Sequence, residues 1–279
     1  MIGNGGQYIH GTDPDEQKRL SVLNDLLNDA SLTSMNIQEG SRILDVGSGL
    51  GQFTRMMARA AGTDGTVIGI ERDSEQIKEA ARQARIAGDG ALVEFRTGDA
   101  VGLPLRDDEW GTFDIAHARF LLEHVPDPLA VVRSMVGAVK IGGRVVLEDD
   151  DHDVMRLWPE LPVADRLWRT YADTYRRVGN DPFVGRRLVA LLHEAGASPR
   201  QNRWLPFSSC AGHPLFKTFM ANFAGVISSA RQTIISSSAW SDEEFDHALT
   251  AIEEWSRRPD AALWYGTFWA EGVRRELGR

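Results

Sequence analysis

The stretch RILDVGSGLG at residues 42–51 decides how the rest of the sequence is interpreted. Residues 42–46 form a short apolar run, and glycine then occupies every second position from Gly47 to Gly51. A helical segment follows from Phe53 to Ala61, so the order is strand, glycine-rich turn, helix. Glycine lets the backbone approach a ligand closely, and the first turn of a helix presents free N–H groups. The stretch therefore predicts a ligand-binding turn.

The same alternation of strand and helix continues along the chain. Further strands are expected at 66–71, 92–96, 113–118 and 144–148, with helices at about 74–87 and 127–140. Strands that alternate with helices of this length predict βαβ crossovers and a parallel sheet covered on both faces. Residues 40–150 are therefore predicted to form a doubly wound α/β sheet.

Composition narrows the class of protein. The 279 residues include 31 Lys and Arg against 40 Asp and Glu, a net charge of −9. This acidity argues against a nucleic-acid groove, which needs clustered basic residues. The single cysteine, Cys210, excludes an intramolecular disulfide framework and a cysteine-based zinc cluster. No apolar run approaches the roughly 18 residues of a membrane span, so we expect a cytoplasmic protein without nucleic-acid or membrane partners.

The residues around the glycine turn indicate which ligand it binds. The dinucleotide pattern G-x-G-x-x-G/A fails, because the sixth position counted from Gly47 is Gln52. Asp45 would repel a pyrophosphate but suits a cationic amino group. Glu71, 20 residues after Gly51, is placed to accept hydrogen bonds from ribose hydroxyls. With Asp99 available for an adenine amino group, these features together describe S-adenosylmethionine.

The motifs resemble those of a known family. Residues 45–51 resemble motif I of the class I S-adenosylmethionine-dependent methyltransferases, and Glu71, residues 98–100 and the sequence LEHVPD at 122–127 resemble the motifs that follow. The last motif is typical of the small-molecule branch that includes the ubiquinone and menaquinone methyltransferases. The resemblance implies a Rossmann-like sheet of seven strands, mostly parallel, with the last strand antiparallel.

We expect the cofactor, released as S-adenosylhomocysteine, to contact the glycine turn, the strand ends and an N-terminal segment that the resemblance implies folds over it. These residues are Tyr8, His10, Asp45, Gly47, Ser48, Gly49, Gly51, Glu71, Arg72, Gly98, Asp99, Ala100 and Arg119.

The methyl acceptor is expected above the ends of the fourth and fifth strands, because ligands of open α/β sheets bind beyond the carboxyl ends. His124 is a candidate general base, since its unperturbed pKa lies near neutrality. Some small-molecule O-methyltransferases that resemble this chain pair such a histidine with an aspartate at the end of strand five, here Asp149. A purely structural role for His124 is the alternative.

The acidic run at residues 148–153 suggests a cation site, because hard cations prefer clustered carboxylates. Consecutive residues at a strand end point to alternate sides, however, and a site would also need ligands from elsewhere in the chain. We therefore expect a solvated turn with one functional acid and no metal.

The remaining length is assigned to additions around the sheet. Residues 1–39 are expected to form an N-terminal flap and helix, residues 40–150 the cofactor-binding core, and residues 151–279 the rest of the core. Helical inserts at about 151–180 and 208–258 are expected to form a lid over the acceptor.

The resulting hypothesis is an S-adenosylmethionine-dependent methyltransferase for a small aromatic or apolar metabolite, for example of secondary metabolism. An RNA or protein methyltransferase and a non-catalytic cofactor-binding scaffold are the alternatives. The acidity and the lack of an Asn- or Asp-Pro-Pro-Tyr/Phe sequence count against the former. The acceptor, the atom that is methylated and a homodimeric state are left open.

Overall fold

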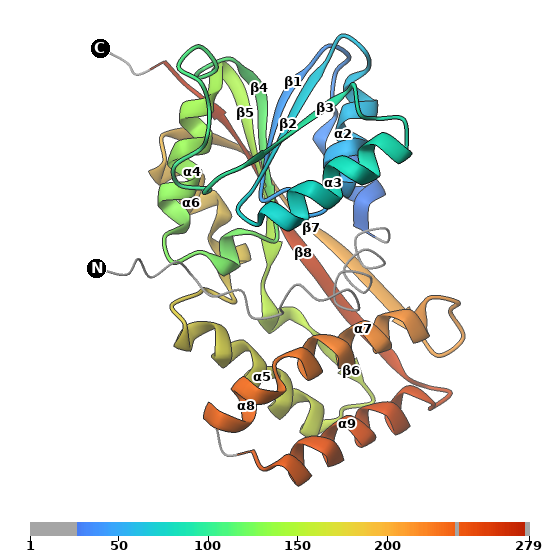
Figure 1. Cartoon of the computed structure of the whole chain (residues 1–279). Coiled ribbons are helices and arrows are strands. Elements are labelled where there is room, and N and C mark those ends of the chain that lie inside the picture. Colours follow the sequence, from blue (N-terminus) through green and yellow to red (C-terminus); the bar gives the residue numbers. More distant parts are fainter. Residues whose placement is uncertain (1–26, 238–239, 277–279) are drawn as a thin grey trace.

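The computed structural model describes residues 27–237 and 240–276, and the strands of this region form one sheet in the order β3-β2-β1-β4-β5-β8-β6, with β7 also paired to β8 (Figure 1). The strands β1 to β5 run parallel, and β8 runs antiparallel to β5. The bounds are β1 (Arg42–Val46), β2 (Thr66–Glu71), β3 (Val93–Thr97), β4 (Phe113–Arg119), β5 (Val139–Asp150), β6 (Arg156–Trp158), β7 (Ala197–Cys210) and β8 (Ala262–Arg274).

The doubly wound sheet and its antiparallel last strand are confirmed, but the expected count of seven strands was one short. The described residues form eight strands, and the additional one is the three-residue β6. It pairs with the first residues of β8, beyond the point where β5 ends. A strand this short carries no periodic signal in the sequence.

Two layers of helix cover the sheet. Helices α2 (Gln52–Ala61) and α3 (Ser74–Ile86) lie on one face, and α4 (Pro128–Ala138) and α6 (Leu188–Glu194) lie on the other (Figure 1). Each face has its own apolar core, and Met35, from the helical residues 27–35, packs into the core beneath α2. None of the helices in the described ranges is long and apolar enough to cross a membrane.

Four further helices form what we call the helical group: α5 (Pro162–Arg177), α7 (Phe216–Ser229), α8 (Arg231–Ser237) and α9 (Asp242–Ser256). They enclose a third apolar core against the ends of β7 and β8 that project beyond the parallel strands (Figure 1). The last residue of β7, Cys210, is paired with the first residue of β8, Ala262. The segment that carries α7, α8 and α9 therefore leaves and re-enters the sheet at one place.

Side-chain caps mark the starts of three helices. The Asp73 side chain accepts hydrogen bonds from the first turn of α3, and Asp127 caps α4 ahead of a proline at its first position. A capping box of Ser241 and Glu244 stands at the start of α9. The first two caps explain why the starts expected at 74 and 127 agree with the observed starts of α3 and α4 within one residue.

One predicted boundary was wrong. The helix expected to reach residue 140 ends at Ala138, and β5 begins at Val139 rather than at Arg144. A register shift against β4 accommodates the extra residues, and Gly143 lies too close to the backbone of Phe113 to carry a side chain.

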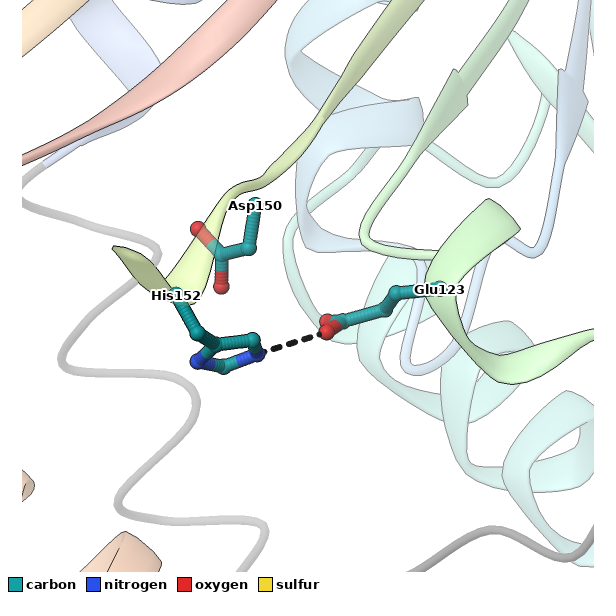
Figure 2. Close-up of side chains that lie close together, drawn as sticks. All are labelled: Glu123, Asp150 and His152. Atoms are coloured by element: carbon teal, nitrogen blue, oxygen red, sulfur yellow. Dashed lines mark hydrogen bonds and ion pairs between the residues drawn. The ribbon is translucent and has the colours of Figure 1, made fainter. Parts of the chain in front are cut away.

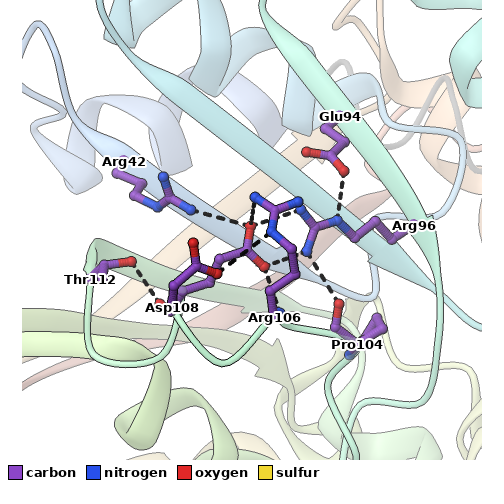
Figure 3. A network of polar contacts seen from close by, with 8 residues as sticks. Arg42, Glu94, Arg96, Pro104, Arg106, Asp108 and Thr112 are labelled. Atoms are coloured by element: carbon purple, nitrogen blue, oxygen red, sulfur yellow. Dashed lines mark hydrogen bonds and ion pairs between the residues drawn. The ribbon is translucent and has the colours of Figure 1, made fainter.

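A buried ion-pair network joins β1, β3 and the loop before β4 (Figure 3). Glu109, whose side chain is 2% exposed, receives two hydrogen bonds from Arg96, at 2.6 and 2.8 Å. Arg106 lies 2.7 Å from the same carboxylate, and Arg42 lies 3.4 Å away. These hydrogen bonds, those from Arg96 above all, lower the pKa of Glu109 to about 2.

We expect the substitution Glu109→Gln to lower the free energy of unfolding at neutral pH by about 1.5–3 kcal/mol, because it removes charge-assisted hydrogen bonds from a buried site. The folded-state pKa lies below the unfolded value, so the stabilisation is fully present above about pH 4.5 and is lost as the pH falls toward about 2. Urea titrations of both proteins at several pH values measure this difference.

The matched control is Glu94→Gln, which removes a half-exposed partner of the same Arg96. It should cost less than Glu109→Gln. A gap between the wild type and Glu109→Gln that stays constant as the pH falls below about 4 would contradict this assignment.

Candidate functional site

The glycine turn connects β1 to α2 at the carboxyl edge of the sheet. Gly47, Gly49 and Gly51 have φ angles of 79°, 53° and 69°, a region that residues with side chains rarely adopt. A Cβ on Gly51 would lie 2.4 Å from the ring of Phe95, and one on Gly47 would lie 3.1 Å from the side chain of Leu121. The turn is thus packed between β3 and the segment that follows β4.

Glu71, at the end of β2, reaches back to the glycine turn. One carboxylate oxygen accepts a hydrogen bond from the backbone N–H of Gly49 at 3.2 Å, and the other accepts from Asp73 at 3.1 Å. The backbone N–H of Gly98 donates to the carbonyl of Glu71 at 3.0 Å, which brings the end of β3 to the same edge. The glycine turn, the end of β2 and the end of β3 were each predicted to contact the cofactor, and these three segments meet here.

Other predicted cofactor residues lie at this edge or outside the described part of the chain. Asp99 is exposed, and its Oδ1 accepts a hydrogen bond from the N–H of Val101 at 2.7 Å. Arg72 is also exposed, directly after Glu71 in the chain. Tyr8 and His10 lie outside the described residues, so their predicted contacts stay predictions.

Asp45 is buried and engaged within the protein. Its Oδ2 accepts a hydrogen bond from the hydroxyl of Thr54 at 2.5 Å, and its Oδ1 lies 2.8 Å from His117 Nδ1. These contacts tie β1 to α2 and β4. A ligand amine that approached this carboxylate would share it with both partners.

Arg119, at the end of β4, is also buried. Its guanidinium lies 4.2 Å from the centre of the Phe53 ring and donates to Asn28 at 2.7 Å. Burial lowers its pKa, while the charges of Glu148 and Asp45 raise it. The side chain that the sequence assigned to the cofactor thus lies between α2 and the helical residues 27–35.

The turn after β4 is held by Asp149. Phe120 has a φ of 51°, and residues Leu122–His124 form a single 3-10 turn. The carboxylate of Asp149, which is fully buried, accepts the backbone N–H groups of Leu121 at 3.2 Å and Leu122 at 2.8 Å. The predicted pair of His124 and Asp149 is therefore joined through the backbone of this turn.

Glu123, Asp150 and His152 form a group that we call the Glu123 cluster (Figure 2). Glu123 Oε2 lies 2.9 Å from His152 Nε2, and its other oxygen lies 3.3 Å from His124 Nε2. The ring of Tyr175 stacks on His124 at a centroid distance of 5.5 Å and lies 5.2 Å from His152. Both histidines and Glu123 are buried.

Burial dominates the electrostatics of this region. It raises the pKa of Glu123, and the charge of Asp181 raises it further. It also raises the pKa values of Asp149 and Asp150, with the charge of Glu123 as the next cause in both. Burial lowers the pKa of His152. All four shifts favour the uncharged forms, so burial disfavours both the negative carboxylates and a positive His152.

The helical group covers the Glu123 cluster with aromatic side chains. The indole of Trp168 donates to the carbonyl of His152 at 2.6 Å, and the hydroxyls of Tyr171 and Tyr175 lie 2.8 Å apart. Further rings from α7, β7 and β8 continue this apolar surface, namely Phe207, Phe219, Phe223 and Tyr265. An apolar environment with a few polar groups at its base is typical of small-molecule sites.

The acidic run at 148–153 is not the solvated turn that the sequence suggested. Asp149, Asp151 and His152 are buried, because α5 and the turn after β4 pack over this segment. The sequence alone assigned no role to Glu123, whereas Tyr171 and Tyr175 fall in the predicted lid insert at about 151–180. The spacing of Asp150 and His152, two residues apart at a strand end, was the available signal that both side chains point the same way.

Comparisons with known proteins agree with this architecture. A family model described as a methyltransferase domain matches residues 16–202, more than half of the chain. The demethylmenaquinone methyltransferase of Bacillus licheniformis is 30% identical over 216 residues, which cover 70% of this chain and 90% of the relative. The match spans only 56 to 62% of the length of other curated relatives.

Two solved structures show the same fold. A SAM-dependent methyltransferase from Aquifex aeolicus has a TM-score of 0.53 at 19% identity, covering 69% of this chain and 92% of its own. The [4+2]-cyclase SpnF has a TM-score of 0.54 at 21% identity, covering 99% of this chain and 88% of its own.

The role of Asp149 can be tested by stability. We expect Asp149→Ala to cost about 1–3 kcal/mol for each N–H left without an acceptor, whereas Asp149→Asn keeps an acceptor oxygen and should cost less. Urea unfolding of the two variants makes the comparison. Equal losses in both would contradict a role in which the oxygen holds the turn.

Proposed function

The chain belongs to the methyltransferase domain family, and we propose that it transfers a methyl group from S-adenosylmethionine to a small apolar or aromatic acceptor. The observation that carries the proposal is the hydrogen bond between the Glu71 carboxylate and the backbone of Gly49. It joins the carboxylate expected at the ribose to the turn expected at the methionine part of one ligand.

The residues at this edge fit such a cofactor. The glycine turn allows close approach of a ligand, and the hydroxyl of Ser48 is buried with no hydrogen-bond partner among the described residues. Glu71 and Asp99 add carboxylates at the ends of β2 and β3 for hydroxyl and amino groups. Ser48 would thus be satisfied by a polar group of the ligand.

Bound S-adenosylmethionine supplies a methyl group on a positively charged sulfur. The residues of the chain then have to align an acceptor and, where the acceptor is a hydroxyl, accept its proton. His124 is proposed for this second task, because it lies three residues after Leu121, whose side chain contacts Gly47 of the glycine turn. Asp149 is proposed as a positioning residue that holds the intervening backbone.

The helical group is proposed as the lid over the acceptor. Its aromatic core continues to the Glu123 cluster and His124, which supports an apolar acceptor with at least one polar group. The relative from Bacillus licheniformis is named for demethylmenaquinone, an acceptor of this kind. Cytoplasmic location stays a prediction from the sequence, and a homodimeric state stays open.

Cofactor binding is the first test. Calorimetry should detect binding of S-adenosylhomocysteine to the wild type, and Glu71→Ala should weaken it by about ten- to a hundredfold, since a charge-assisted hydrogen bond is lost. The matched control is Glu75→Ala, at an exposed position in the first turn of α3. Absence of binding to the wild type would refute the proposed function.

His124→Ala tests the acceptor side. We expect turnover to fall by about 10²- to 10⁴-fold, the usual contribution of a general base, with unchanged affinity for S-adenosylhomocysteine. The formation of methylated product is measured with a panel of hydroxylated aromatic acceptors, starting from naphthoquinols. Unchanged turnover would return His124 to a structural role, in which it stacks on Tyr175 and contacts Glu123.

A further inference from the structure

The function proposed above assigns no chemical step to the Glu123 cluster, and we propose that Glu123, Asp150 and His152 bind a divalent metal ion. The three side chains come from the turn after β4, the end of β5 and the turn that follows it. Each offers one ligand atom, and the three atoms lie within 4.8 Å of one another. Figure 2 shows the side chains converging on a common point.

The geometry suits coordination by a small cation. Glu123 Oε2 and His152 Nε2 are 2.9 Å apart, close to the ~3 Å between neighbouring ligands that each lie about 2.1 Å from an octahedral ion. The His152 ring is fixed by contacts with Trp168, Tyr171 and Tyr175, at centroid distances of 5.1, 5.5 and 5.2 Å. The ring is therefore held with its Nε2 toward the carboxylates.

The charges around the cluster call for a cation. In the described part of the chain, the ion pairs of Glu123 are with histidines, and Asp150 forms none with a lysine or arginine. The neighbouring Asp151, by contrast, is paired with Arg186 at 2.5 and 2.6 Å. Carboxylates buried together repel each other unless protons or a metal ion neutralise them. A divalent ion would neutralise Glu123 and Asp150 together.

An independent observation points to a missing ligand. Asp150 is partly buried, and its Oδ1 accepts no hydrogen bond of ordinary geometry among the described residues, although the similarly unpartnered hydroxyl of Tyr265 lies near the same carboxylate. The Asp150 carboxylate extends toward the His152 ring and the Glu123 carboxylate (Figure 2). Buried polar atoms without partners are rare. A metal ion bound at this point would give Asp150 Oδ1 a partner.

The ligand set indicates which ion is bound. Two carboxylates and one imidazole combine hard oxygen with borderline nitrogen, a set that suits Mn²⁺ and similar ions. Three protein ligands leave positions open for oxygen atoms of another molecule. This step rests on the proposed function: the acceptor would be an oxygen-bearing aromatic molecule, such as one with neighbouring hydroxyl or keto groups, that completes the coordination.

The proposed site includes a ligand from outside the acidic run at residues 148–153. Residues 148–153 could not form a site by themselves, because consecutive side chains alternate in direction. Glu123 is the additional ligand from elsewhere, 27 residues before Asp150, and the hydrogen bonds from Leu121 and Leu122 to Asp149 bring it there.

The test is titration of the full chain with Mn²⁺ alone, followed by calorimetry and by electron paramagnetic resonance. We expect one equivalent to bind, and we expect Glu123→Gln and Asp150→Asn each to weaken binding by at least about tenfold. The matched control Glu194→Gln, at an exposed position at the end of α6, should bind as the wild type does. Circular dichroism verifies that each variant is folded.

Several results would overturn the proposal. The proposal is wrong if the wild type binds none of Mn²⁺, Mg²⁺ and Zn²⁺. It is also wrong if either variant is folded and binds the ion as tightly as the wild type does. If both variants fail to fold, the wild type decides alone, since its thermal midpoint must rise with Mn²⁺. Calorimetry with S-adenosylhomocysteine on the same samples separates the two hypotheses: cofactor binding without metal binding refutes only the metal site, and the reverse refutes only the proposed function.

Discussion

The hydrogen bonds from Leu121 and Leu122 to the buried carboxylate of Asp149 join the two halves of the candidate site. On one side of this contact, Leu121 packs against Gly47 and so meets the glycine turn. On the other side, His124 stacks on Tyr175 of the helical group, and Glu123 pairs with His152. A turn of five residues, one of them with a positive φ, thus sets the distance between the proposed cofactor and the proposed acceptor.

The protein satisfies its buried acids in three different ways. Glu109 is paired with Arg96, and Asp151 is paired with Arg186. Both pairs hold loops to the sheet. Asp149 accepts backbone N–H groups, which shapes a turn without adding a counter-charge. Asp45 and Glu123 contact histidines, whose charge depends on a proton. Neither of the last two arrangements supplies a permanent positive charge beside the carboxylate.

The start of the sheet was predictable from the sequence because β1 and β2 are short apolar runs that end beside a glycine or in an acid, at Val46-Gly47 and Ile70-Glu71. The meeting of Glu71 with the glycine turn followed from the rule that parallel strands end at one edge. The environment of residues 148–153 did not follow, since their burial depends on how α5 and the turn after β4 pack, which local sequence does not encode. Three-residue β6 and the contact of Glu123 with His152 were missed for the same reason.

The pairing of Cys210 with Ala262 has a consequence for how such a chain can diversify. Paired residues of antiparallel strands lie about 5 Å apart, so the 51 residues between these two begin and end at a gap that a tight hairpin could close. Exchange of this segment would alter the surface offered to an acceptor and leave the strands around the glycine turn in register. Under the proposed function, part of the surface over the acceptor would thus be able to change without altering the residues at the glycine turn.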